Sequence, residues 1–405
     1  MRVSTSQIYD VGARNIIKNQ SDLYKTQNQL STGRRILTAE DDPVAASQVL
    51  LDTQAREVNS LYADNQSNAS AQLALEESRL SSVVDAIQFI KEKVIAGSNA
   101  SLSDTQREYF AVDLQGQLDA LLGIANSADA SGHYLFSGFQ GATQPFQLLT
   151  SGSVQYVGDE GQRLLQVGAS RQIAVSDSGR EIFLNNGSGN GTFVTSGAPG
   201  NTGTGIIDNG TVLNPSVALP TPPSYYQVSF TSGTQYDITI EPAGTSVVSG
   251  ATYATGAAIT GITGVSFAIQ GAPAAGDTFT VAASTNRSVF ETVQDLITAF
   301  RTDIAGDPVA AASVRNTINS NLENLDRALE NVSRVQASIG SRRKELEGLS
   351  DLSSNLDLQY QEKISDLQDL DYTEAISRFK KQQTQLEAAQ NSFVQISGLS
   401  LFNYI

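Results

Sequence analysis

Both ends of the chain carry a narrow line of apolar residues with the spacing of a helix. Apolar side chains recur every seven positions in the first forty residues: Tyr9, Ile16, Leu23, Leu30 and Leu37. In residues 371–405, five apolar residues are spaced 3, 7, 7 and 3 positions apart: Ile376, Phe379, Leu386, Phe393 and Ile396. Residues at these spacings lie along one side of a helix, so each end is predicted to form a helix with a thin apolar seam.

A thin seam gives a single helix too little apolar area to stay folded alone, so each end needs a partner. The simplest partner is the other end, in this chain and in neighbouring copies. The alternative is that these residues are ordinary core positions of a monomeric bundle. We predict an assembly interface at eight seam residues of the two ends: Ile16, Leu23, Leu30, Ile376, Phe379, Leu386, Phe393 and Ile396.

The middle of the chain differs in composition from its flanks. Of the 33 glycines, 22 lie between residues 141 and 284. Short runs of β-forming residues occur here, at 154–157, 164–167, 173–175, 225–230, 236–240 and 278–281. Ser232 and Gly233 separate two of these runs, which predicts a hairpin. The segment 187–223 is rich in Gly, Ser, Thr and Pro and is predicted to form long loops.

The flanks of this insertion read as helices. Three places have the pattern of a helix start. Asp42 before Pro43 and Asp307 before Pro308 each place a capping residue ahead of a proline, and Ser103 with Gln106 forms the pattern of a capping box. The polar stretch 65–70 is predicted to be a weak point in the second helix. The predicted fold is α+β: an elongated multi-helix bundle or coiled coil built from both termini, with an inserted β-rich domain. Three regions are expected: 1–40 plus 368–405, terminal assembly segments; 41–140 plus 285–367, a helical rod; and 141–284, the β-rich insertion.

Composition excludes several classes of function. The net charge of -16 argues against nucleic-acid binding, which needs clustered Lys and Arg. The chain has no cysteine, and His133 is its only histidine, so no catalytic, cofactor or metal site is predicted. No apolar run is long enough to span a membrane, and the first residues lack the apolar core of a cleaved signal peptide. This pattern does not exclude export by another route.

Two clusters allow more than one reading. Arg342, Arg343 and Lys344 lie beside Glu345 and Glu347 and are predicted to form a solvated helix face rather than a partner-binding patch. Three tyrosines of the insertion would form a sugar-binding platform if they were exposed together: Tyr225, Tyr226 and Tyr236. In that case, the chain would be a carbohydrate-binding surface protein.

Several local stretches resemble the flagellin superfamily. Residues 30–36 (LSTGRRI) and 41–47 (DDPVAAS) look like its N-terminal block. The opening MRVST, residues 132–138 (GHYLFSG), 143–146 (TQPF) and the ending ISGLSLFNYI are similar to the hook-associated protein 3 family within it, as are residues 156–183. The resemblance covers about 1–185 and 285–405, whereas 186–284 matches nothing we recognise.

The resemblance implies a structural protein, not an enzyme, at the junction between hook and filament of a bacterial flagellum, outside the cell. Its implied partners are copies of itself, a neighbouring hook-associated junction protein and flagellin, with neither nucleic acid nor membrane among them. It also implies export through the flagellar type III apparatus without a cleaved signal peptide, and an export chaperone on the C-terminal helical region, about residues 325–405. A flagellin that forms the filament itself is the nearest alternative.

Overall fold

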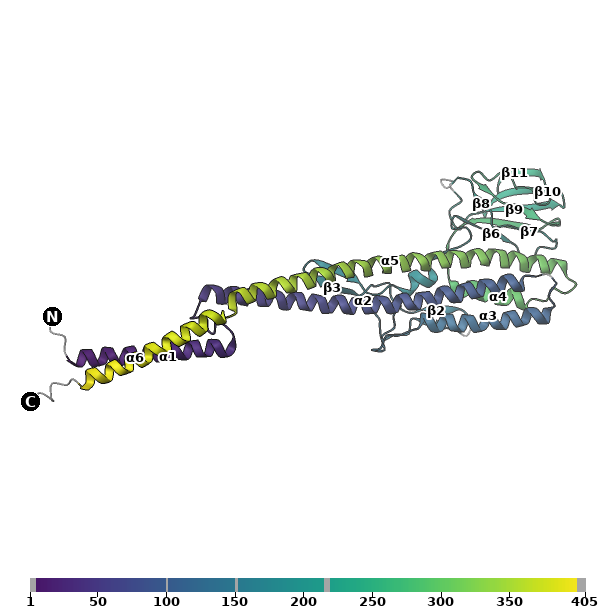
Figure 1. The fold of residues 1–405 in the computed structure, drawn as a ribbon. Helices are drawn as coiled ribbons and strands as arrows, with labels where there is room; N and C mark the ends of the chain where they lie inside the picture. Colours follow the sequence, from purple (N-terminus) through teal and green to yellow (C-terminus); the bar gives the residue numbers. More distant parts are fainter. Residues whose placement is uncertain (1–4, 100, 150–151, 215–218, 399–405) are drawn as a thin grey trace, which may run out of the picture. The chain divides into compact units, whose positions relative to one another are not determined.

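The computed structural model describes residues 5–99, 101–149, 152–214 and 219–398. The chain divides into two compact units (Figure 1). The terminal unit consists of Met1–Asn65 and Gly348–Ile405, and the central unit of Gln66–Glu347. The described residues form six α-helices: α1 (Thr5–Thr32), α2 (Pro43–Gly97), α3 (Asp104–Ala125), α4 (Val289–Arg301), α5 (Pro308–Gln368) and α6 (Tyr372–Gly398).

The helices begin where the sequence indicates. Asp42 accepts a hydrogen bond from the backbone N–H of Ala45 (3.0 Å), and Asp307 accepts one from Val309 (2.9 Å), directly before α2 and α5. Ser103 and Gln106 form a reciprocal capping box at the start of α3. These predicted helix starts are confirmed.

The apolar register of α2 and α5 forms the helical core of the central unit. Every seventh residue of α2 is fully buried there: Leu73, Leu80, Ile87 and Val94. The same holds for α5: Leu325, Val332, Ile339 and Leu346. The stretch 65–70, predicted to be a weak point, lies within α2, which is continuous through it. Gln66 is buried in this stretch, and its Nε2 donates to the carbonyl of Val167 (2.8 Å).

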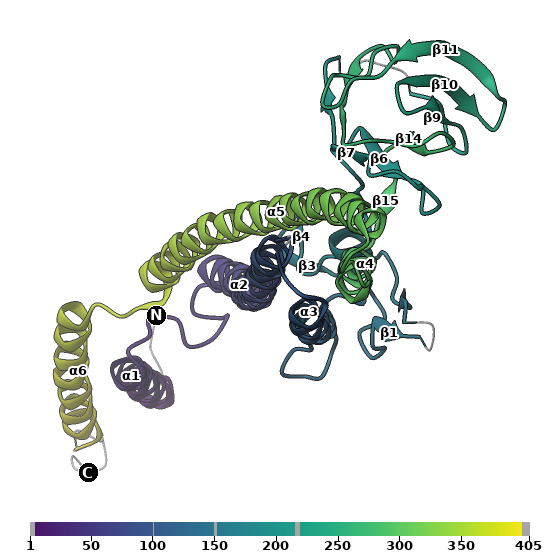
Figure 2. The same ribbon diagram turned by 90° about the vertical axis from the view of Figure 1, so that its right-hand side faces the viewer.

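Figure 2 views α2, α3 and α4 nearly end-on and shows the inserted sheet beside the start of α5. Four aromatic rings pack together between the helices and the first strands of the central unit: Phe136, Phe146, Phe183 and Phe290. Phe183 belongs to a short π-helix, η1 (Arg180–Leu184). Two small hairpins precede it: β1 (Phe146–Leu148) with β2 (Val154–Tyr156), and β3 (Leu164–Gly168) with β4 (Arg171–Ala174).

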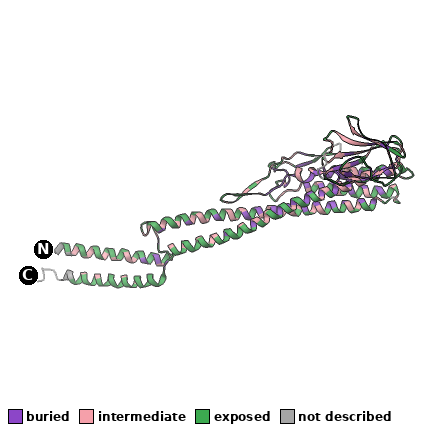
Figure 3. Cartoon of the chain, turned by 90° about the horizontal axis from the view of Figure 1, so that it is seen from above, coloured by how far each residue is buried: buried purple, intermediate pink, exposed green. Residues whose placement is uncertain are grey.

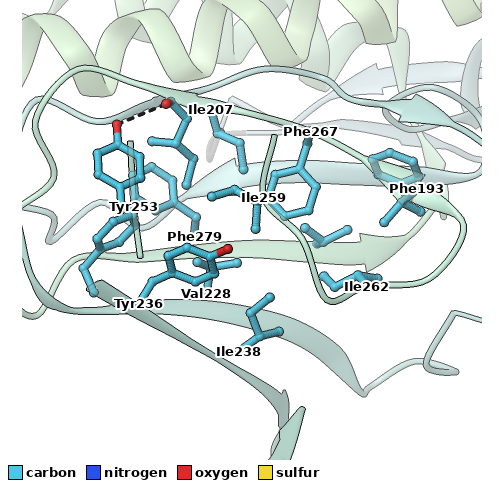
Figure 4. Packing of buried hydrophobic residues seen from close by; sticks show 14 residues of the cluster. Phe193, Ile207, Val228, Tyr236, Ile238, Tyr253, Ile259, Ile262, Phe267 and Phe279 are labelled. Atoms are coloured by element: carbon cyan, nitrogen blue, oxygen red, sulfur yellow. Dashed lines mark hydrogen bonds between the residues drawn. The ribbon is translucent and has the colours of Figure 1, made fainter. Parts of the chain in front are cut away.

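The insertion is built on a five-stranded antiparallel sheet with the order β11-β10-β9-β14-β6. Its strands are β6 (Phe193–Gly197), β9 (Tyr225–Ser232), β10 (Gln235–Glu241), β11 (Thr245–Thr252) and β14 (Thr278–Ala283). Short pairs accompany it: β5 (Asn186–Gly187) with β15 (Asn286–Arg287), β7 (Ile206–Ile207) with β13 (Ile269–Gln270), and β8 (Thr211–Val212) with β12 (Val265–Ser266). Its own core includes Phe193, Phe230, Phe267 and Phe279 (Figure 4).

Asparagine side chains on α5 hold the insertion to the helix. Asn316 accepts from the N–H of Ile207 (2.8 Å) and donates to the carbonyl of Gly205 (3.0 Å). Asn324 accepts from the N–H of Gly189 (2.8 Å). These contacts satisfy backbone groups of the short strand β7 and of two loop glycines, so they help to fix where the insertion leaves α5.

The fold class is confirmed: helices from both ends of the chain flank an inserted β-rich domain. The six predicted strands are present, and β9 pairs with β10 around the predicted hairpin. Two details are wrong. Residues 187–223 contain β6, which joins the main sheet, and not loops alone. Tyr236 is buried in the core of the insertion, so the three tyrosines do not form an open platform.

The basic cluster on α5 also differs from its prediction. Arg342 is mostly buried and pairs with Asp177, while its Nη1 donates to the carbonyl of Ala174 (2.9 Å). Arg343 pairs with Glu77 of α2. These two arginines therefore join α5 to other elements of the central unit instead of forming a solvated face with helical neighbours.

Candidate assembly site

The helices α1 and α6 of the terminal unit lie side by side (Figure 1). Half-buried and buried positions recur along each with alternating steps of three and four, the spacing of a coiled-coil seam. On α1 these positions are Tyr9, Gly12, Ile16, Asn19, Leu23, Thr26 and Leu30. On α6 they are Ala375, Phe379, Gln382, Leu386, Ala389 and Phe393. We call these two sets together the seam.

The seam buries little apolar surface. Among the side chains that the structure describes on α1 and α6, the fully buried ones are Thr26, Gln29 and Ala375. The large apolar residues of the seam are all half-buried, and most of the surface of both helices is exposed (Figure 3). Because burial of large apolar side chains is the main source of folding free energy, the pair is weakly held within one chain.

Phe393 makes the best-defined contact across the seam. Its ring meets that of Tyr9 edge-on, with 6.1 Å between the centroids. It also lies against the backbone of α1 at Gly12, where a side-chain carbon would come within 2.8 Å of the ring. A glycine at this position therefore lets the two helices approach closely.

A short connector fixes how α1 and α6 begin their contact. Arg34 and Asp369 form an isolated antiparallel bridge. Arg35 donates its backbone N–H to the carbonyl of Gln368 (2.7 Å), and Leu370 donates to that of Gly33 (2.9 Å). Gly33 adopts a φ of 70°, a backbone conformation that residues other than glycine rarely adopt, so it lets the chain turn at the end of α1.

Asp41 stabilises the loop between α1 and α2. Its carboxylate accepts hydrogen bonds from the N–H groups of Leu37 (2.9 Å) and Thr38 (3.0 Å) and pairs with Lys25 of α1. The hydrogen bond to Lys25, with those from the backbone, lowers the pKa of Asp41 to about 2. Asp41 thus ties the loop to α1, next to the helix cap at Asp42.

The predicted interface residues fall in three groups. Ile16, Leu23, Leu30, Phe379, Leu386 and Phe393 lie half-buried on the seam. Ile376 lies off the seam, with 47% of its side chain exposed. The side chain of Ile396 lies outside the described residues. Whether any of them contacts another copy stays a prediction.

Sequence reasoning missed half of the seam. The missed positions alternate with the predicted ones, but they are small or polar and give no apolar signal: Gly12, Asn19, Thr26, Ala375, Gln382 and Ala389. The alternating three-and-four spacing from the known apolar positions would have found them.

Metal binding and membrane spanning have no support in the described part of the chain. No group of three or more His, Cys, Asp or Glu side chains there could hold a metal ion. None of the described helices combines the length and the apolar character that crossing a bilayer requires.

Comparisons with known proteins bear on the whole chain. The bacterial flagellin N-terminal helical region matches residues 3–141, and the bacterial flagellin C-terminal helical region matches 322–405. Flagellar hook-associated protein 3 of Escherichia coli K12 is 31% identical over 405 residues, which covers 99% of each chain. The chain belongs to the flagellar hook-associated protein 3 family.

Solved structures agree with this family. A hook-associated protein 3 from Legionella pneumophila is 30% identical, with a TM-score of 0.73, over 79% of this chain and 98% of that one. FlgL from Xanthomonas campestris is 28% identical, with a TM-score of 0.71, over 78% of this chain and 99% of that one. A flagellin, FljJ of Caulobacter vibrioides, is 26% identical over only 36% of this chain. Membership of this family makes the chain a structural protein of the flagellum and not an enzyme.

Proposed function

We propose that this protein assembles between the hook and the filament of the flagellum through the paired helices α1 and α6. The observation that carries the proposal is the seam. Two helices of 28 and 27 residues face each other without fully burying one large apolar side chain among those described. Neighbouring copies in a ring or short tube would cover the half-buried seam and add the missing apolar contacts.

Assembly is coupled to folding of the two ends. Ordering the backbone costs about 1–2 kcal/mol per residue, and isolated helices of this length are marginal in water. The half-buried seam residues offset too little of that cost in one chain. The two ends are therefore disordered in the free subunit and become paired helices on assembly, which prevents premature polymerisation and keeps the chain extended for export.

The partners of the proposed junction are further copies, a neighbouring hook-associated junction protein and flagellin. A relative of this chain from Legionella pneumophila, 31% identical, is described as a flagellar junction protein, which supports this place in the flagellum. An export chaperone would hold the C-terminal helical region, about 325–405, before assembly. Export would use the flagellar type III route without a cleaved signal peptide.

Hydrogen exchange on the free, dilute protein tests the coupling. We expect rapid exchange of the amides in α1 and α6 and strong protection of the buried parts of α2 and α5 in the central unit. Protected amides in both terminal helices before assembly would show that the pair is stable alone and contradict the coupling.

The junction role itself has two tests. A strain that lacks the gene is expected to make hooks and to shed filament protein into the medium. The purified protein at high concentration is expected to form no long filaments unaided. Long spontaneous filaments would instead favour a flagellin that forms the filament.

A further inference from the structure

The first part of α2 is inside-out. In the terminal unit, two of the three positions that continue the buried register of α2 are polar, Asp52 (7% exposed) and Asn59 (8% exposed), and the third is the small Ala45. Val49 and Tyr62 of the same stretch are half-buried. Five large apolar residues of the stretch are 48–78% exposed: Val44, Leu50, Leu51, Val58 and Leu61. In the central unit the same helix has the ordinary arrangement, with Leu73 and Leu80 fully buried.

The five exposed residues lie on one side of the helix. At 100° per residue they span about 120°, opposite to the buried positions. Ser47 and Gln54 lie between them, so the strip carries no charge. We call it the outer face of α2; in Figure 3 the first part of α2 is largely exposed.

The buried side of this stretch makes polar contacts with α5 of the same chain. Asn59 donates its side-chain amide to the carbonyl of Ser353 on α5 (2.7 Å). Arg56 pairs with Asp357 of α5 (2.7 Å). Rotating α2 to bury its apolar side would break these contacts and leave buried polar groups without partners, so the outer face stays available.

We infer that the outer face of α2 is a second assembly surface, which packs against the terminal unit of another copy of this chain. The inference rests on the proposed function and adds a contact to it that lies outside the seam. An exposed strip of apolar residues marks an interaction surface, and the absence of charge indicates an apolar partner.

A second copy fits this partner for two reasons. Copies that each carry a net charge of -16 repel one another, so a contact that buries no carboxylate is favoured. A head-to-tail ring also needs two different surfaces on each subunit. The terminal unit supplies a second apolar set on α1, α5 and α6: Ile17, Tyr24, Leu352, Leu358, Tyr372, Ile376 and Val394.

The distribution of exposed apolar residues agrees with a contact confined to this unit. Of the 23 large apolar side chains that are exposed among the described residues, 13 lie in the terminal unit, which has less than a third of the chain. The outer face of α2 supplies five of them.

Photo-cross-linking in intact flagella tests the surface and its occupant. Leu51 is replaced by a genetically encoded benzophenone amino acid in the full-length chain, and Ser60, exposed on another side of α2, is replaced in a control. We expect cross-linked dimers of this chain from position 51, at least several-fold more than from position 60. Cross-links to a different protein, or yields no higher than the control, would overturn the inference.

A substitution separates this inference from the proposed function. The double variant Leu51→Asp with Leu61→Asp is expected to keep the thermal midpoint of the free protein and to lose incorporation into flagella, whereas Ser60→Asp incorporates normally. Normal incorporation of the double variant, when Phe393→Ala is not incorporated, would refute the second surface and leave the proposed function standing. Normal incorporation of Phe393→Ala would count against the proposed function itself.

Discussion

The ring of Phe393 on α6 lies against the backbone of α1 at Gly12, so closely that a side-chain carbon at Gly12 would come within 2.8 Å of Cδ2 of the ring. Carbon atoms do not pack at that distance, so the contact requires either glycine or a shift of the ring. The ring of Tyr9, nearly one turn earlier on α1, meets the ring of Phe393 edge-on. This cluster fixes the alignment of α1 with α6.

Gly12→Val is expected to block assembly, because its branched side chain would push Phe393 out of the seam. Asn15→Val is the matched control: it places the same residue, with the same helix propensity, at an exposed position of the same helix. Immunoblots of isolated flagella should detect the control variant and not Gly12→Val. Equal amounts of the two variants would show that the close approach is not needed.

Phe393→Ala and Leu23→Asp are expected to abolish incorporation while the thermal midpoint of the free protein stays unchanged. The reason is that, under the proposed coupling, the terminal helices fold only on assembly and contribute nothing to that transition. Calorimetry of the free variants measures the thermal midpoint, and immunoblots of isolated flagella measure incorporation. Gln385→Ala, at an exposed position of α6, serves as control. A sharp fall in the midpoint would place these residues in the core of the monomer instead.

The sequence was most informative where burial and apolar character coincide. On α5, the apolar residues that recur every seven positions from Leu325 to Leu346 are fully buried, so the sequence shows the helical spacing directly. Asp42 and Asp307 could be read as helix caps because their role depends on neighbours in the chain. The strands β9 and β10 were found because β-branched and aromatic residues alternate along them.

Sequence reasoning failed where polar residues occupy buried positions. Asn59 follows the register of Leu73 and Leu80 but gives no apolar signal, so the inside-out stretch of α2 was not found. The role of Asn331 is equally hidden, since its partners lie about 150 positions away in the chain. β6 was read as loop because it lies in a Gly-rich segment, and only its pairing with β14 makes it a strand.

Asn331→Ala is expected to destabilise the central unit by about 1–3 kcal/mol. Its buried amide donates to the carbonyls of Glu181 (2.7 Å) and Ile182 (3.2 Å) of η1, which would be left without that donor. Denaturant unfolding of the full-length protein measures the loss. Asn355→Ala, at an exposed position of the same helix, should change stability by much less. Equal effects would mean that the contacts to η1 contribute little.

Glu76 should make the stability of the central unit depend on pH. It is buried on α2, where Oε1 accepts from the N–H of Asp177 (3.0 Å) and Oε2 has no hydrogen-bond partner among the described residues. Burial, reinforced by the nearby carboxylate of Asp177, raises the pKa of Glu76 from 4.5 to about 8. The folded chain therefore holds a proton between pH 4.5 and 8 that the unfolded chain has lost.

This contribution to stability is fully present below pH 4.5 and is lost as the pH rises through about 8, at up to about 1.4 kcal/mol per pH unit. Glu76→Gln, whose amide cannot ionise, should remove that slope and be more stable than the natural chain above pH 8. Denaturant unfolding at several pH values between 5 and 9 measures it. Glu77→Gln, a neighbouring carboxylate with 38% exposure, should keep the slope. If the natural chain and Glu76→Gln lost stability in parallel over this range, Glu76 would have to be ionised in the folded protein.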